Sequence, residues 1–353
     1  MKANTIILEG GLGNRMRVAA SAYAMAKRTG IPMRVLWTSQ WGMRCRFDEL
    51  FKAMDSPDSP PALTDSPPSL PVREGAECNR LDEGLQSTKV TAPSLTGREG
   101  GESSGGESGE SLAFSLRDTS KFLFARPTLK NLYLPRLLQR LSYRHIIYAP
   151  QIWYLNRDGF DYEAWFRQGG TLMTAYRDFC PWSSDDLRLL FQPNDQVGRL
   201  IDERTAAFTP NTIGVHIRRT DHQQAIDESP LELFIEAIDR EQEASSRMAA
   251  YHGTPFSIYL ATDDEATKEA MRKRYGKRVI TSEAEATRES TDGIRDALVE
   301  MYALSRTRHI YGSAGSTFSP IAACLGDVPI TILQRGGTGS VDLLCQIRSQ
   351  EQV

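Results

Sequence analysis

The segment GVHIRRTD, residues 214–221, places ionisable side chains at the end of what the sequence indicates is a buried strand. The apolar side chains of residues 213–217 alternate onto one face of that strand, so His216 and Arg218 share the opposite face at its exit. A buried charge is costly unless it is paired. Because arginine can grip a diphosphate with two parallel hydrogen bonds, we expect an anionic ligand to offset these charges.

Two further polar segments follow predicted strands in the same half of the chain. LATDDE places Asp263 and Asp264 after one strand, and SAGSTFS places Ser316 and Thr317 ahead of a predicted helix. Ligands of doubly wound sheets bind beyond the carboxyl ends of the strands, and a helix N-terminus favours an anion. Structural interpretations stay open, because Ser and Thr often cap helices, Asp263 could be an N-cap, and Arg218 could pair with an aspartate.

Signals for a metal or another cofactor are weak. GGLGNRM lacks the third glycine of a dinucleotide-binding turn, and no segment fits a Walker A loop or a HExxH zinc helix. A lone pair of aspartates is poor evidence for a divalent cation. We therefore expect a site that holds a diphosphate without a metal.

The elements that carry these segments follow an α/β pattern. NTIILEG is predicted as a strand, GGLGNR as a glycine turn, MRVAASAYAMAKRTG as a helix closed by Gly30, and IPMRVLW as a second strand. From residue 212 onward, predicted strands and helices alternate as far as VPITIL. Both halves therefore favour parallel sheets in doubly wound domains.

Residues 55–111 interrupt this pattern with Pro, Ser, Gly and Glu. Such a composition cannot offset the entropy of ordering, so we predict a disordered insertion. After it, Arg136, Arg140 and Arg144 are spaced four apart and predict a helix with a basic face. The favoured interpretation is an ordinary amphipathic helix with a solvated basic face, and the alternative is attraction to an anionic lipid or glycan.

The composition limits the protein class. The chain has 353 residues, 40% hydrophobic and 25% charged, with a formal net charge of -3, which favours a globular protein of two domains and no general attraction to nucleic acid. Its five cysteines are scattered, which favours free thiols in a reducing compartment. The first residues do not fit a signal peptide, and no apolar run approaches the roughly 20 residues of a membrane span. We expect a cytoplasmic protein, with the basic helix as the candidate peripheral contact to a membrane.

Four segments together resemble the GT-B fucosyltransferase superfamily, which includes the α1,2-, α1,6- and protein O-fucosyltransferases: GGLGNRMRVAASAYAMAKRTG, GVHIRRTD, YLATDD and ALVEMYALSRTRHIYGSAGSTFSPIAACLG. The resemblance implies two Rossmann-like, doubly wound domains that face one cleft. Residues 1–190 would form the acceptor-side domain, and residues 191–353 the domain that binds a nucleotide sugar. The implied activity is the metal-independent, inverting transfer of L-fucose from GDP-fucose to a hydroxyl of a glycan acceptor.

The resemblance also implies roles for single residues. Arg218 would be the catalytic residue on the diphosphate, and His216 would lie against the nucleotide. Glu300 would accept hydrogen bonds from the guanine edge, with Asp296 as the alternative. The remaining nucleotide-sugar positions would be Arg219, Asp221, Asp263, Ser316 and Thr317. The fucose and acceptor side would comprise Gly11, Gly13, Asn14 and Arg15, although the family often has glutamine at the last of these.

Three alternatives stay open. A transferase with another nucleotide-sugar donor would keep the same fold. A non-catalytic nucleotide- or glycan-binding relative is the second, although such a chain need not keep His216, Arg218 and Glu300. An NAD-dependent oxidoreductase is the third, and the missing glycine and the lack of an acidic residue after IPMRVLWTSQ argue against it. The sequence does not identify the general base or the acceptor.

Overall fold

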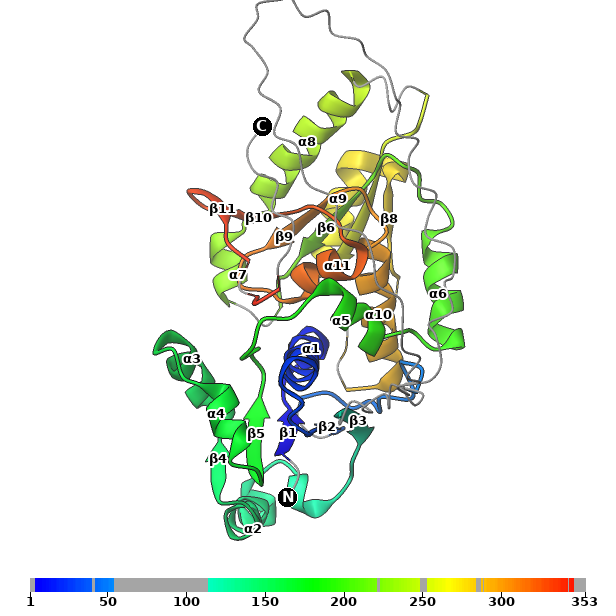
Figure 1. The fold of residues 1–353 in the computed structure, drawn as a ribbon. Coiled ribbons are helices and arrows are strands. Elements are labelled where there is room, and N and C mark those ends of the chain that lie inside the picture. Colours follow the sequence, from blue (N-terminus) through cyan, green and yellow to red (C-terminus); the bar gives the residue numbers. More distant parts are fainter. Residues whose placement is uncertain are drawn as a thin grey trace, which may run out of the picture. The chain divides into compact units, whose positions relative to one another are not determined.

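The computed structural model describes residues 4–39, 42–53, 114–220, 223–247, 253–283, 287, 289–341 and 343–345. The predicted insertion at 55–111 lies outside these residues, as does Asp221. The described part contains a five-stranded and a six-stranded sheet, each with helices beside it (Figure 1). Within this part, no helix is both long and apolar enough to cross a membrane.

The first sheet is parallel throughout and has the strand order β3-β2-β1-β5-β4. The chain adds β2 and β3 on one side of β1, and β5 and β4 on the other. The loop after β1 therefore lies at a topological switch point, where α/β sheets bind ligands. The strands are β1 (Asn4–Leu8), β2 (Met33–Trp37), β3 (Phe114–Asp118), β4 (His145–Ile147) and β5 (Thr171–Ala175).

Helix α1 (Leu12–Thr29) begins earlier than predicted. The sequence predicts a glycine turn that extends to Arg15, and this is wrong. Gly10 has a φ of +80°, which glycine adopts without strain, so the turn is complete at Gly11 and this residue is already the N-cap. The predicted C-cap is confirmed, because Gly30 has a left-handed φ of 68°.

The sequence does not predict strands β3, β4 and β5. Strand β5, with the sequence TLMTA, is completely buried beside β1. Such short apolar runs carry too little periodicity to separate a strand from a piece of helix. The helices of this half are α2 (Leu134–Ser142), α3 (Ala149–Arg157), α4 (Tyr162–Arg167) and α5 (Ser184–Leu190).

The second sheet has the order β11-β10-β9-β6-β7-β8 and is parallel except for the β10–β11 pair. Strand β6 has β7 on one side and β9 on the other, so the carboxyl ends of all three meet at one edge. The strands are β6 (Thr212–Ile217), β7 (Ser257–Thr262), β8 (Val279–Thr281), β9 (Ile310–Ser313), β10 (Ile330–Gln334) and β11 (Gly337–Gly339). The helices are α6 (Asp195–Thr205), α7 (Gln223–Glu228), α8 (Leu231–Arg247), α9 (Glu265–Tyr275), α10 (Thr291–Leu304) and α11 (Phe318–Gly326).

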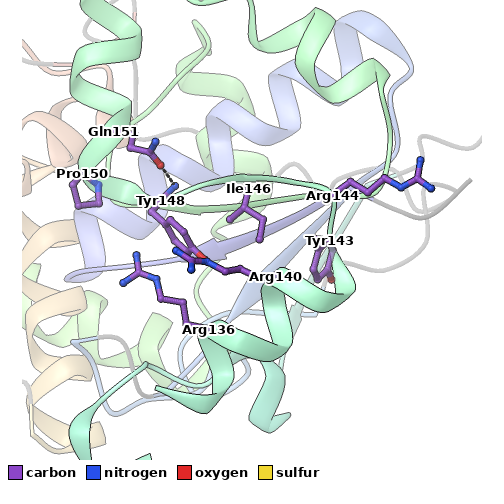
Figure 2. A pocket seen from close by; sticks show the side chains of 8 residues that line it. All are labelled: Arg136, Arg140, Tyr143, Arg144, Ile146, Tyr148, Pro150 and Gln151. Atoms are coloured by element: carbon purple, nitrogen blue, oxygen red, sulfur yellow. Dashed lines mark hydrogen bonds between the residues drawn. The ribbon is translucent and has the colours of Figure 1, made fainter. Parts of the chain in front are cut away.

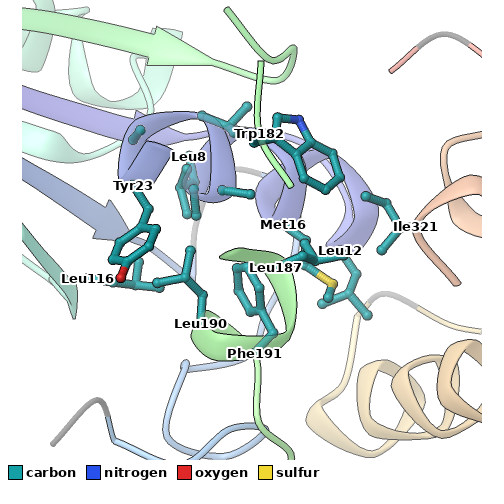
Figure 3. Packing of buried hydrophobic residues seen from close by; sticks show 14 of the residues in the cluster. Leu8, Leu12, Met16, Tyr23, Leu116, Trp182, Leu187, Leu190, Phe191 and Ile321 are labelled. Carbon is teal, nitrogen blue, oxygen red and sulfur yellow. The ribbon is translucent and has the colours of Figure 1, made fainter. Parts of the chain in front are cut away.

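One hydrophobic cluster joins the helices of both halves. Leu12 and Met16 of α1 pack with Leu187 of α5 and Ile321 of α11 in this cluster (Figure 3). Helix α5 ends at Leu190, which belongs to the same cluster. The domain boundary that we place after residue 190 therefore falls at a helix end inside shared packing, and it stays a prediction.

Candidate functional site

His216 is buried at the end of β6, next to the first turn of α11. Its ring stacks on Phe318 with 4.9 Å between the ring centroids, and Nδ1 lies 3.3 Å from Ser319 Oγ. Burial, followed by the charge of Arg218, lowers the pKa of His216 to about 3. The imidazole is therefore neutral at physiological pH, with one face covered by Phe318 and Nδ1 directed at Ser319.

Arg218 leaves β6 between the two neighbouring strands. Its backbone N–H donates to Ser313 Oγ at the end of β9 (3.0 Å), and its guanidinium lies 3.0 Å from a carboxylate oxygen of Asp263 after β7. Arg218 thus pairs with an aspartate, as the structural interpretation of the sequence allowed. A guanidinium carries five N–H donors, and the side chain is still 20% exposed, so the pair orients Arg218 without covering it.

Asp263 ties the exits of β6 and β7 together. Its carboxylate also accepts hydrogen bonds from the Arg219 N–H (2.8 Å) and from the Thr220 hydroxyl (2.7 Å). Burial alone would raise the pKa of Asp263, but these hydrogen bonds and the charge of Arg218 outweigh it and hold the pKa below its usual range. The N-cap of α9 is Asp264, not Asp263. Asp263 is therefore an ionised carboxylate that fixes the polar turn after β6.

Arg219 takes part in this turn through its backbone. Its side chain donates instead to the carbonyl oxygen of Ile226 in α7 (3.4 Å). Burial lowers the pKa of Arg219, and the nearby carboxylates oppose that shift. The structure thus brings the Arg219 amide to Asp263 and directs its guanidinium toward α7.

The loop between β9 and α11 supplies hydroxyl groups at the third strand end. Ser313 Oγ donates to the His216 carbonyl (3.3 Å), and Ser316 Oγ accepts from the Phe318 N–H (3.3 Å). Thr317 is the N-cap residue of α11 but does not cap the helix with its own side chain. This loop therefore presents a helix N-terminus, with its favourable dipole, beside the exit of β6.

The glycine turn of the first half meets this loop. Thr317 Oγ1 donates to Asn14 Oδ1 (3.3 Å), and a Cβ atom added to Gly13 would lie 3.0 Å from Thr317 Oγ1 and 3.2 Å from the Thr317 carbonyl oxygen. Glycine at position 13 is thus what allows α1 and α11 to approach with their N-termini together. The two polar helix starts that the sequence singles out are adjacent in the fold, with Gly11 as the N-cap of α1.

Arg15 is completely buried in the first turn of α1. Its guanidinium donates to the carbonyl oxygens of Gly10 (2.9 Å) and Thr38 (2.7 Å) and lies 5.0 Å from the centre of the Trp37 ring. Burial lowers its pKa to about 10, which leaves it charged at neutral pH. These contacts hold the glycine turn against the end of β2.

Glu300 and Asp296 lie one turn apart on α10 but have different surroundings. Asp296 accepts hydrogen bonds from Arg204 (2.7 Å) and from the Ser282 hydroxyl (2.9 Å). Within the described part of the chain, Glu300 has no hydrogen-bond or ion-pair partner. Burial, then the charge of Asp296, raises the pKa of Glu300 to about 8. Of the two carboxyl groups, Glu300 is the one that a ligand can engage without breaking an existing pair.

Glu9 carries a partly buried carboxyl group that the sequence motifs do not single out. It follows β1 directly, and its backbone N–H donates to the Ala175 carbonyl at the end of β5 (2.7 Å). Burial raises its pKa, while a hydrogen bond with Thr174 and the charges of Arg126 and Arg136 oppose that shift. Its position as the last residue before a glycine turn, at a switch point, is the signal that could have identified it.

The described residues contain no group of three or more His, Cys, Asp or Glu side chains arranged to hold a metal ion. The carboxyl edge of β9, β6 and β7 instead combines one arginine, one ionised carboxylate, one neutral histidine and a helix N-terminus. Such an arrangement is suited to a diphosphate next to a flat ring system.

Comparisons with known proteins support the fold. No protein-family model matches the chain, and no curated protein matches it. A structure of NodZ α-1,6-fucosyltransferase soaked with GDP-fucose is 17% identical, with a TM-score of 0.52 over 97% of this chain and 100% of that chain. Structures of NodZ co-crystallised with GDP and of NodZ from Bradyrhizobium are each 16% identical, with TM-scores of 0.51 over 97% of this chain and 99% of theirs. The α/β fold implied by the sequence motifs is confirmed, and the chain has the GT-B type fold of these fucosyltransferases.

Proposed function

We propose that the protein is an inverting glycosyltransferase that moves L-fucose from GDP-fucose to a hydroxyl of a glycan acceptor. The observation that carries this proposal is the position of Arg218 at the end of strand β6. There it lies between Asp263 and the loop that joins β9 to α11. GDP-fucose in the NodZ structure of the same fold supports the choice of donor. A GDP-sugar other than GDP-fucose would use the same diphosphate contacts and is distinguished by the donor test below.

Arg218 is the catalytic residue in this proposal. The bond between the anomeric carbon and the diphosphate oxygen breaks, negative charge grows on the departing GDP, and the guanidinium stabilises that charge as it forms. The N-terminus of α11, with Ser316 and Thr317, binds the same phosphates. The acceptor oxygen forms its new bond on the opposite face of the sugar, where the transition state resembles an oxocarbenium ion.

The nucleoside is held by His216 and Glu300. The neutral ring of His216 lies against the nucleotide, and the Glu300 carboxylate accepts the N–H groups of the guanine edge. Asp263, Thr220 and the Arg219 amide fix the turn that orients Arg218. Asp221 lies outside the described residues, so its role on the nucleotide-sugar side stays a prediction. The contacts proposed above require no metal.

In this proposal the acceptor binds to residues 1–190, and the nucleotide sugar binds to residues 191–353. Gly11, Gly13 and Asn14 border the fucose, because they lie where α1 meets Thr317. Arg15 acts indirectly, by holding the glycine turn in place.

We assign the general base to Glu9. A carboxylate with a raised pKa accepts a proton more readily near neutral pH, and Glu9 stands directly before the glycine turn. The variant Glu9→Gln should release GDP from GDP-fucose about 100-fold or more slowly than wild type. Its Kd for GDP should be unchanged. An unchanged rate would remove Glu9 from this role.

Isothermal titration with GDP and GMP in EDTA tests the diphosphate contact. Wild type should bind GDP much more tightly than GMP, and Arg218→Ala should weaken GDP binding about 10- to 100-fold by removing a charged hydrogen bond. Arg199→Ala, on an exposed position of α6, is the matched control and should bind like wild type. Equal binding by wild type and Arg218→Ala would rule out the proposed diphosphate site.

Release of GDP from a panel of donors tests the sugar. GDP-fucose should be turned over fastest, with GDP-mannose and UDP-glucose as comparison donors. Faster turnover of another donor would leave the proposed diphosphate site unchanged. It would show that the transferred sugar is not fucose. Binding of GDP with no turnover of any donor would favour a nucleotide-binding protein without activity.

A further inference from the structure

A second charged region is formed by residues 119–157, whose Arg126 and Arg136 also act electrostatically on the carboxyl group of Glu9. Residues 119–157 contain no Asp or Glu, although the whole chain has a net charge of -3. They contain seven basic side chains: Lys121, Lys130, Arg126, Arg136, Arg140, Arg144 and Arg157. This segment includes α2 and is the strongest candidate in the described part for a surface that meets a negative partner.

Helix α2 has its apolar side turned outward. Its buried residues are Pro135 and Gln139, and the Gln139 amide is used to donate to the Leu123 carbonyl (2.8 Å). Leu137 is 55% exposed and Leu141 is 76% exposed. An ordinary surface helix does the opposite and buries its leucines against the core. The favoured interpretation of the sequence, an ordinary amphipathic helix, therefore does not hold for α2.

The turn before α2 continues this apolar surface. Leu129 is 80% exposed and Leu132 is 86% exposed, and Leu132 and Tyr133 both adopt a left-handed φ, of 52° and 54°. Non-glycine residues adopt this conformation at a cost, so the backbone holds these side chains outward against its own preference. Of the twelve large hydrophobic residues exposed in the described part, nine lie between residues 122 and 154, in the segment that contains α2.

A basic pocket lies beside the exposed leucines, between α2 and the edge strand β4 (Figure 2). Its volume is about 570 Å³, and its lining includes Arg136, Arg140 and Arg144 with no acidic residue. Arg136 and Arg140 converge on Tyr148, while Arg144 extends away from them (Figure 2). The Arg136 guanidinium lies 4.0 Å from the centre of the Tyr148 ring, and its buried Nε has no hydrogen-bond partner among the described residues. The pocket can therefore accept an anionic group such as a phosphate.

We propose that α2 and the turn before it dock on an anionic phospholipid bilayer. The exposed leucines insert at the boundary between headgroups and acyl chains, and the arginines of the basic pocket contact headgroup phosphates. A nucleic acid would match the charge but not the leucines. A second copy of this chain would bring two uniformly basic surfaces face to face, which like-charge repulsion opposes. The proposal goes beyond the glycosyltransferase function and does not depend on it.

Co-sedimentation of the full chain with vesicles tests the proposal. Wild type should bind vesicles of phosphatidylglycerol and phosphatidylcholine, bind pure phosphatidylcholine weakly, and dissociate as salt is raised. The double variant Leu137→Ser, Leu141→Ser should bind at least about tenfold more weakly, and Arg140→Gln about fivefold more weakly. Leu200→Ser and Arg199→Gln, on exposed positions of α6, are the matched controls and should bind like wild type.

Several results would overturn the proposal. Absence of wild-type binding to anionic vesicles would do so, and so would unchanged binding of the double leucine variant. Release by inorganic phosphate at constant ionic strength would assign the pocket to free phosphate. A dimer in gel filtration that the leucine variant abolishes would assign the surface to a second copy. GDP titration and circular dichroism on every variant separate these outcomes from misfolding and from failure of the nucleotide site.

Discussion

The two ionisable side chains proposed to hold the nucleoside are both mainly uncharged at neutral pH, for opposite reasons. Burial pushes the pKa of His216 down to about 3 and pushes the pKa of Glu300 up to about 8. The histidine thus stays neutral across the physiological range. The glutamic acid must lose a proton before its carboxylate can accept the N–H groups of guanine.

That proton makes GDP binding depend on pH. Below about pH 8, binding to an ionised Glu300 releases a proton, so affinity should rise by up to about tenfold per pH unit between pH 7 and 8 and flatten above. Glu300→Gln should bind at least about tenfold more weakly, because its amide cannot accept both N–H groups, and it should show no such slope. Titrations at pH 7.0, 7.5 and 8.0 measure this, and a slope that survives in Glu300→Gln would assign it to another group.

His216 should make the folded protein sensitive to acid. The unfolded histidine binds its proton near pH 6.5 and the native one only near 3, so between these values the unfolded state binds more protons and stability falls as pH falls. From pH 7 to 5, wild type should lose about 2 kcal/mol relative to His216→Asn. Glu300 acts in the opposite direction, but it is present in both proteins and cancels in the comparison. Urea unfolding at the two pH values measures the difference, and parallel stabilities would contradict the burial of a neutral His216.

Sequence patterns locate the residues of the site better than they pair them. The alternation in β6 is enough to put His216 and Arg218 on one face at the strand exit. It cannot reveal that Arg218 pairs with Asp263 or that Arg204 pairs with Asp296. These pairs depend on which strands and helices become neighbours. The resemblance names Glu300 ahead of Asp296, but only the structure shows that Asp296 is already paired.

At the scale of elements, the approach of α1 to α11 depends on a missing side chain. Gly13→Ala would place a Cβ 3.2 Å from the carbonyl oxygen of Thr317, a backbone atom that cannot easily move. Gly198→Ala in α6 has no atom within 4 Å of its new Cβ and is the matched control. We expect Gly198→Ala to stabilise the fold by up to about 1 kcal/mol through helix propensity, and Gly13→Ala to destabilise it or gain nothing and to bind GDP more weakly. Urea unfolding and GDP titration measure both, and equal stabilisation by the two variants would show that the contact at position 13 has no consequence.

Long and periodic elements are the ones that the sequence predicts well. The alanine-rich α1 and the alternating elements after residue 212 are present in the predicted order. Strand β5 escapes prediction because TLMTA is a short buried run, and β4 because only three residues form it. The exposed leucines of α2 could not have been predicted either, since a 3.6-residue pattern shows that a helix has two faces and not which of them meets the core.

At the scale of the whole molecule, the shared core should make the two halves unfold together. We expect calorimetry to show one transition, and GDP at about 100 times its Kd to stabilise it by about 2.7 kcal/mol and raise Tm by about 5 °C. With tenfold weaker binding at the same GDP concentration, Glu300→Gln should lose about half of this shift. Two separate transitions, only one of which shifts to higher temperature with GDP, would contradict this expectation. They would show that α1, α5 and α11 do not couple the halves.

The packing of α1 on α11 also sets an order of events during synthesis. Leu12 and Met16 leave the ribosome early, but Ile321, against which they pack, is made near the end of translation. At a translation rate of roughly 5–20 residues per second, Ile321 is made about 15 to 60 s after Met16. During that time the nascent chain carries an apolar helix face without this partner, and the pairing is completed only when α11 emerges.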